Sequence, residues 1–187
     1  MVDYSRMKDG EIGLLLGAGM ARSNGAWAGF NVSKRLVFET RYWMVLVRQT
    51  HITLGSCNVL LKRRARSVRD LAPREFRDLL PALSRYEALL QRVFEPTKFY
   101  YAISGQSNPH FHLHAIPRYD SDSIRMFANM QWVDPDWPYF PDFPRDPIPT
   151  DDWVLDEVTT RLQARAGGGC GGCFHREFSS STIVPRI

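Results

Sequence analysis

The chain has 187 residues, of which 44% are hydrophobic and 12% aromatic, enough for one medium-sized domain with a packed core. Its 24 basic and 20 acidic residues give a formal charge of +4, which suits an anionic ligand without requiring a nucleic-acid surface. Three cysteines in a chain of this length do not resemble the disulfide framework of a small secreted domain, and the apolar run 12–20 is too short to span a bilayer. We therefore expect a cytoplasmic protein with no membrane segment.

The first elements in chain order are an arm and a group of strands. Residues 1–31 are rich in glycine and small residues and lack periodicity, which predicts an irregular arm before a folded domain that begins at Val32. β-branched and aromatic residues over 35–39 and 42–47 predict a hairpin, and the run 57–61 predicts a third strand.

A long amphipathic helix follows these strands. Apolar residues recur every three or four positions over 73–94, which is the spacing of one helix face. Pro73 fits the first turn of this helix, and the charge of Glu75 interacts favourably with the helix dipole there. Pro81 lies inside the pattern and lacks an N–H, so it predicts either a bend near Arg77 or two separate helices.

Two more strands follow the helix. Residues 98–104 and 111–116 have the composition of strands, and the polar residues 105–109 between them are typical of a turn. Because proline cannot donate to a strand ladder, Pro117 is expected to end the second of these strands.

The last part of the chain is expected to have less regular structure. From about residue 120, prolines and aromatic residues predict an extension that wraps a surface, up to a short helix at 151–166 capped by Asp151 or Asp152. Residues 167–187 are rich in glycine and serine, which predicts a flexible tail. The predicted domain therefore spans residues 32–166.

The most informative run is His110-Phe111-His112-Leu113-His114, which places three of the five histidines at two-residue spacing. Successive side chains of a strand point to opposite faces, so the three imidazoles share one face and the two apolar side chains take the other. Packing alone explains this row poorly, because each buried imidazole needs a hydrogen-bond partner.

Covalent catalysis at phosphorus is one chemistry that such a row can perform. A neutral imidazole attacks a phosphoryl centre and forms a phosphohistidine, which water then cleaves. The middle histidine, His112, is the natural nucleophile. Its neighbours His110 and His114 can fix its tautomer, hold the phosphate oxygens or protonate a leaving group.

The segment 105–119 resembles the signature of the histidine triad (HIT) nucleotide hydrolases and reads Gly-Gln-Ser-Asn-Pro-His-Phe-His-Leu-His-Ala-Ile-Pro-Arg-Tyr. It is most similar to bacterial members described as diadenosine polyphosphate hydrolase-like, and the resemblance extends over residues 35–120. It implies an α+β fold, a HIT-like antiparallel sheet with one long helix packed on it. It also implies a homodimer that acts on a nucleotide, with no cofactor, no metal and no specific nucleic-acid partner.

Position by position, the resemblance makes His112 the nucleophile that takes the nucleoside monophosphate, with His110 and His114 positioning it and the phosphate oxygens. Gln106 and Ser107 match polar positions that contact phosphate or the leaving group. A histidine at the third place of the row is similar to the hydrolase branches, because related uridylyltransferases carry glutamine there. The expected reaction is hydrolysis of a nucleoside phosphoanhydride or phosphoramidate.

Two other interpretations of the histidine row stay open. A His-x-His strand can supply two zinc ligands of a metal-dependent hydrolase, although the sequence places no third ligand beside them. A nucleotide-binding or sensor protein with little turnover is the other, because the residues 47–49 include no carboxylate where many family members hold ribose. Near the end of the chain, Cys170-x-x-Cys173-x-His175 has the spacing of metal ligands but no partner pair, which favours a disordered tail.

Overall fold

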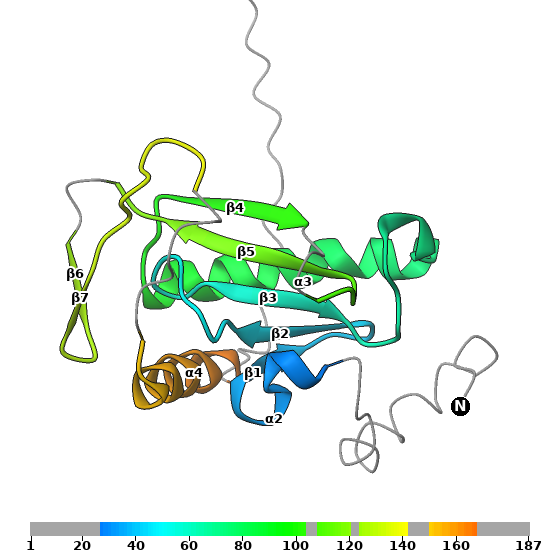
Figure 1. The fold of residues 1–187 in the computed structure, drawn as a ribbon, viewed down its shortest axis with the longest axis horizontal. Coiled ribbons are helices and arrows are strands. Elements are labelled where there is room, and N and C mark those ends of the chain that lie inside the picture. Colours follow the sequence, from blue (N-terminus) through cyan, green and yellow to red (C-terminus); the bar gives the residue numbers. More distant parts are fainter. Residues whose placement is uncertain (1–26, 104–107, 121–123, 142–149, 168–187) are drawn as a thin grey trace, which may run out of the picture.

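A five-stranded antiparallel sheet is the centre of the computed structural model, which describes residues 27–103, 108–120, 124–141 and 150–167 (Figure 1). The strand order is β1-β2-β3-β5-β4, and a separate hairpin is formed by β6 and β7. The sheet confirms the predicted α+β class. The strands are β1 (Leu36–Glu39), β2 (Trp43–Val47), β3 (Cys57–Leu61), β4 (Lys98–Ile103), β5 (His112–Arg118), β6 (Arg125–Phe127) and β7 (Met130–Trp132).

The long helix α3 crosses behind the sheet, and α4 lies beside β1 at its lower edge (Figure 1). The amide of Gln163 in α4 donates to the carbonyl of Leu36 at 2.7 Å, so this edge of the sheet is covered. No helix in the part of the chain that the structure describes is long and apolar enough to cross a membrane. The helical elements are η2 (Ala28–Phe30), α2 (Val32–Arg35), η3 (Val68–Asp70), α3 (Pro73–Val93) and α4 (Asp152–Ala166).

The main core lies between the sheet and α3. Alternate residues of the strands point toward the helix, as the period of two requires, and Trp43 also donates its indole N–H to the carbonyl of Glu75 at 2.9 Å. The central apolar residues include Trp43, Val45, Val47, Cys57, Val59, Leu61, Leu113 and Ala115 of the sheet and Leu79, Ala82, Tyr86, Leu89 and Leu90 of α3.

Helix α3 corrects two details of the predicted pattern. It is one helix through Pro81, not two. Phe76 and Leu80 fit the apolar spacing but are 61% and 70% exposed. The buried stripe instead includes the small residue Ala82, so the apolar spacing covers more of the helix surface than the face that packs against the sheet. Glu75 lies in the first turn of the helix, as expected. Its carboxylate accepts the N–H of Ala72 at 2.7 Å.

Strand β5 continues past the proline that was expected to end it. Pro117 pairs with Phe99 of β4, whereas β3 stops pairing with β5 at Ala115. The N and O of one strand residue point to the same side, and the carbonyl of Pro117 accepts the hydroxyl of Thr53 on the β3 side. The N–H that Pro117 lacks would point to the β3 side, where no strand pairs with this residue, so its absence costs no ladder hydrogen bond.

The segment after β5 is more ordered than the sequence predicted. It forms the hairpin β6–β7, and Trp132 is buried with its ring centroid 5.3 Å from that of His51. His51 lies in the β2–β3 connection and is fully buried. At the other end, Phe30 is buried, so packed structure begins before Val32.

Two buried arginines, Arg118 and Arg35, fasten the ends of the domain to the sheet through ion pairs. The buried Arg118 at the end of β5 binds Asp134 through two hydrogen bonds, Nε–Oδ2 at 2.5 Å and Nη2–Oδ1 at 3.0 Å. The buried Arg35 pairs with Asp152, at 2.7 Å, and with Asp156, which anchors the first turns of α4. Asp151 occupies the N-cap position of α4, as predicted, without a side-chain hydrogen bond to the helix backbone.

Candidate active site

The three histidines come together on the face of the sheet opposite α3. In the strand register, Leu60 of β3 lies opposite His112, and Asn58 lies opposite His114. The rings of His112 and His114 meet edge to face with centroids 4.8 Å apart, and His110 precedes β5 by two residues. The exposed fractions of the three side chains are 4% for His110, 4% for His112 and 8% for His114. The predicted shared strand face is therefore confirmed for His112 and His114, whereas His110 lies before the strand begins.

The tautomer of His112 is set by its own strand. Its Nδ1 lies 2.7 Å from the carbonyl oxygen of His110, and a carbonyl can only accept, so Nδ1 carries the proton. The lone pair of the neutral ring then resides on Nε2. This arrangement leaves His112 with one nitrogen held by the backbone and the other chemically available for attack on phosphorus.

His110 is fixed by the end of β3. Its Nε2 lies 2.7 Å from the carbonyl oxygen of Leu61 and must donate to it, while its backbone N–H donates to the side-chain oxygen of Asn108 at 3.0 Å. The lone pair of the neutral ring is thus on Nδ1, which is buried and has no hydrogen-bond partner in the described parts of the chain.

Asn58 is a site residue that the sequence analysis missed. Its Oδ1 lies 3.0 Å from Nδ1 of His114, which orients that ring as a carboxylate or carbonyl orients other catalytic imidazoles. Asn58 is the one polar side chain in the otherwise apolar strand Cys57–Leu61, and this was the signal that could have found it. Only the pairing of β3 with β5 shows which histidine it serves.

Burial keeps the three imidazoles neutral. It is the main cause that lowers the pKa of each ring, to about 3 for His114. The positive charge of Arg48 lowers the pKa of His112 and His114 further, whereas the carbonyl of His110 acts in the opposite direction on His112. A neutral His112 is the form that can act as a nucleophile near pH 7.

An apolar wall borders the histidines on the same sheet face. The ring of Phe30 meets the ring of His112 edge to face, with centroids 5.0 Å apart. Phe30 belongs to a second apolar cluster with Met44, Leu46 and Leu60, and Trp27 packs against it. All four residues of this cluster are buried, so they shield one side of the nucleophile from water.

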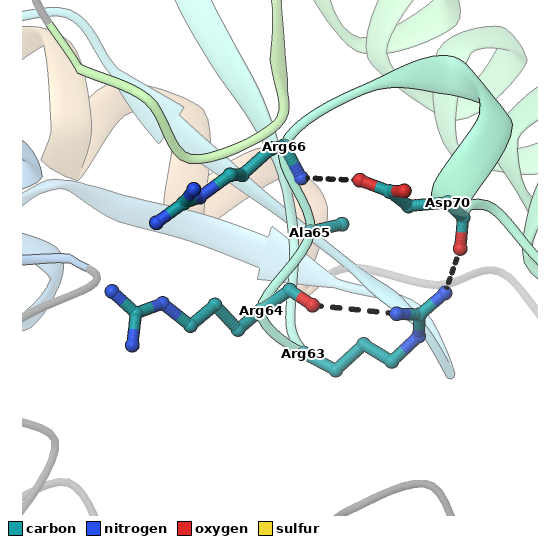
Figure 2. A pocket seen from close by; sticks show the side chains of 5 residues that line it. All are labelled: Arg63, Arg64, Ala65, Arg66 and Asp70. Carbon is teal, nitrogen blue, oxygen red and sulfur yellow. Dashed lines mark hydrogen bonds between the residues drawn. The ribbon is translucent and has the colours of Figure 1, made fainter.

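A basic depression lies where β3 leads into α3 (Figure 2). Figure 2 shows Arg64 and Arg66 extending to the same side, whereas Arg63 turns toward Asp70 and pairs with Glu75. The loop touches the start of β5, because the N–H of Phe111 donates to the carbonyl of Ala65 at 2.8 Å. The charge of Arg64 contributes to the lowered pKa of His110, after the effects of burial and of His112.

The remaining predicted site residues lie elsewhere or are not described. Gln106 and Ser107, expected to contact phosphate, are outside the described residues, as are Cys170, Cys173 and His175. Within the described ranges, no group of three or more His, Cys, Asp or Glu side chains is arranged to hold a metal ion.

Comparison with known proteins agrees with the motif and the fold. Residues 30–121 match the model of the HIT domain. The chain is 28% identical over 98 residues to a bis(5'-nucleosyl)-tetraphosphatase [asymmetrical] from Schizosaccharomyces pombe, a match that covers 50% of this chain and 54% of the relative. The chain thus spans about half the length of this curated relative.

Solved structures show the same fold at lower identity. A histidine triad protein from Marinobacter aquaeolei VT8 has a TM-score of 0.57 and 21% identity, covering 73% of this chain and 91% of that one. A Zn-bound histidine triad family protein from Mycobacterium smegmatis has a TM-score of 0.51 and 17% identity, covering 71% and 83%. The histidine row, the sheet that carries it and the matching domain model together identify the chain as a member of the histidine triad (HIT) family.

Proposed function

We propose that the protein hydrolyses a nucleoside phosphoanhydride or phosphoramidate through a covalent nucleotidyl-histidine. The observation that carries the proposal is the hydrogen bond from Nδ1 of His112 to the carbonyl of His110, which places the lone pair of a neutral ring on Nε2. In the first step a bond forms between Nε2 and phosphorus, and the bond from phosphorus to the leaving group breaks. In the second step water attacks phosphorus, the N–P bond breaks, and the nucleoside monophosphate leaves.

The surroundings of His112 support a nucleotide with a phosphate chain. The buried apolar cluster around Phe30 gives the nucleophile a water-poor environment, which suits attack by a neutral imidazole. The basic depression with Arg64 and Arg66 lies near His110 and suits the phosphates of a leaving nucleotide. The name of the Schizosaccharomyces pombe relative supports a dinucleoside tetraphosphate as such a substrate.

The direct test is release of AMP by the purified wild-type chain from diadenosine tetraphosphate and from adenosine 5'-phosphoramidate, with and without EDTA. We expect AMP from at least one substrate at a rate that EDTA does not reduce, because the nucleophile is a side chain and no metal ion takes part in the two steps. Separation of the products by anion-exchange chromatography gives both rates.

Two outcomes would favour the other interpretations. Loss of activity with EDTA that returns with Zn²⁺ would favour a metal-dependent hydrolase, as would zinc that stays with the protein through purification. No AMP from either substrate, together with saturable binding of AMP, would favour a nucleotide-binding or sensor protein.

We further propose a homodimer that uses the edge of the sheet formed by β4. No described strand pairs with the outer side of β4, and Ile103 on this strand is 55% exposed. The opposite edge strand, β1, is covered by α4. An uncovered strand edge is a template for pairing with another strand, here with its copy in a second molecule.

Light scattering after size exclusion should therefore give twice the chain mass of 21.5 kDa. Ile103→Lys should shift the protein toward the monomer, because a charge at the paired edge opposes its own copy. A wild-type mass of one chain at high protein concentration would rule this dimer out.

A further inference from the structure

Arg48 directly follows β2 and lies on the same sheet face as the histidines. Its backbone N–H donates to the carbonyl of Ser56 at 3.0 Å, so it extends the pairing of β2 with β3. In this register Leu46 lies opposite Asn58, which lies opposite His114. Since strand side chains alternate, Arg48, two residues after Leu46, points to the same sheet face as the histidine row.

The side chain of Arg48 is half-buried and has no matching anion among the described residues. Its Nη1 is inaccessible and has no hydrogen-bond partner in the described ranges, and Nη2 has only the hydroxyl of Thr50 at 3.4 Å. None of the ion pairs found among the described residues includes Arg48. Burial lowers its pKa to about 10, so the group stays charged at pH 7. A charge shielded from water is normally paired, and this one has no anionic partner in the described ranges.

The unpaired charge lies within electrostatic reach of the nucleophile. It lowers the pKa of both His112 and His114, and it does the same to the buried His51, whose two ring nitrogens also have no described partner. Rows of side chains two residues apart on a strand are separated by about 6.6 Å, and the arginine side chain spans about one such step. In the strand register Arg48 lies in the row of Ser56, one row beyond His114 and two rows beyond His112. A group that pairs with Arg48 would therefore lie on the His114 side of a phosphorus bound at His112.

We propose that Arg48 binds a second phosphate group of the substrate, in addition to the one that reacts at His112. A guanidinium fits this role because it donates two parallel N–H bonds to a phosphate and stays charged when desolvated. The second phosphate is either the next one in the phosphate chain or one carried on the ribose. The inference rests on the proposed function, because it takes a nucleotide as the ligand.

Binding of three nucleotides tests the proposal without any need for turnover. AMP carries only the phosphate that would sit at His112, ADP adds a chain phosphate, and adenosine 3',5'-bisphosphate adds a ribose phosphate. Calorimetry gives the Kd of each for the wild-type chain, Arg48→Gln, Arg48→Lys and Arg69→Gln. Arg69, an exposed arginine of η3, is the matched control because its substitution removes the same charge away from the histidine face.

We expect ADP or the bisphosphate to bind the wild-type chain at least ten times more tightly than AMP, since charge-assisted contacts to a phosphate are among the stronger hydrogen bonds. Arg48→Gln should remove this advantage and leave the Kd for AMP within about threefold of its wild-type value. Arg48→Lys should keep part of the advantage, and Arg69→Gln should keep all of it. If ADP binds more tightly than AMP, the second phosphate belongs to the phosphate chain of the nucleotide. If the bisphosphate binds more tightly, it belongs to the ribose.

Two results separate failure of this inference from failure of the proposed function. If AMP binds but neither second phosphate tightens binding, or if Arg48→Gln keeps the advantage, Arg48 is not a phosphate-binding residue and only the inference falls. If none of the three nucleotides binds the wild-type chain, the proposed function is wrong and the inference falls with it. Thermal unfolding of each variant shows that the compared proteins are folded.

Discussion

His112→Ala is expected to lower the rate of AMP release by roughly four orders of magnitude or more, because it removes the atom that bonds to phosphorus. The loss should appear in kcat, since the substitution leaves the basic depression with Arg64 and Arg66 in place to bind phosphate. The measurement is single-turnover AMP release from the better of the two substrates, with AMP binding as the readout of an intact site.

His175→Ala is the matched control, since it removes an imidazole outside the described residues and should leave the rate unchanged. A His112→Ala variant that keeps a tenth of the wild-type rate would exclude the covalent mechanism. Wild-type enzyme quenched in alkaline denaturant, in which the N–P bond of a phosphohistidine survives, should also carry a nucleotide on His112 that is absent from the variant.

The pH profile gives a second check on the same residue. Burial lowers the pKa of His112 below the usual 6.5, so more than half of the rings are still neutral at pH 6.5. Because the reaction needs the neutral ring, we expect the acid limb of kcat to fall below pH 6.5 and not above it.

Asp134→Ala is expected to destabilise the fold by about 3–5 kcal/mol, the largest effect on stability that we foresee, because it leaves a buried guanidinium unpaired. Arg118 is fully buried at the end of β5, and Asp134 also accepts the N–H of Tyr119 at 3.1 Å. The carbonyl of Tyr139 accepts a third bond from Arg118, at 2.7 Å. Equilibrium urea unfolding of wild type and variant measures the difference.

Two comparisons make this result specific. Glu157→Ala removes an exposed carboxylate of α4 and should change stability by less than about 0.5 kcal/mol. The double variant Arg118→Met with Asp134→Leu should recover most of the loss, since replacing both partners by apolar side chains avoids the unpaired charge. A single variant as stable as wild type would mean that Arg118 finds another partner.

Local pattern was enough to predict most elements of the domain. The alternation of histidine with apolar residues predicted the strand and the shared face, and the three-and-four spacing predicted the helix that became Pro73–Val93. These signals depend only on the side-chain periods of strand and helix, which can be recognised within a single stretch of sequence.

Partners far apart in sequence were not predictable in the same way. Asn58 meets His114 across 56 positions, and Arg118 meets Asp134 only because the chain turns back after β5. Pro117 was expected to end its strand, and it does not, because its neighbour β3 has already stopped pairing there. Each of these depends on strand register and pairing, which a single strand does not encode.

The sequence by itself determined that this protein carries His112 and His114 on one strand face and a long amphipathic helix, because side-chain period is a local property of the backbone. The tertiary structure alone decided what surrounds the three histidines: the carbonyl of Leu61 at His110, Asn58 at His114 and the unpaired charge of Arg48 nearby. Tautomer, pKa and the charge a ligand must bring are set by neighbours in space, and these come from other strands of the sheet.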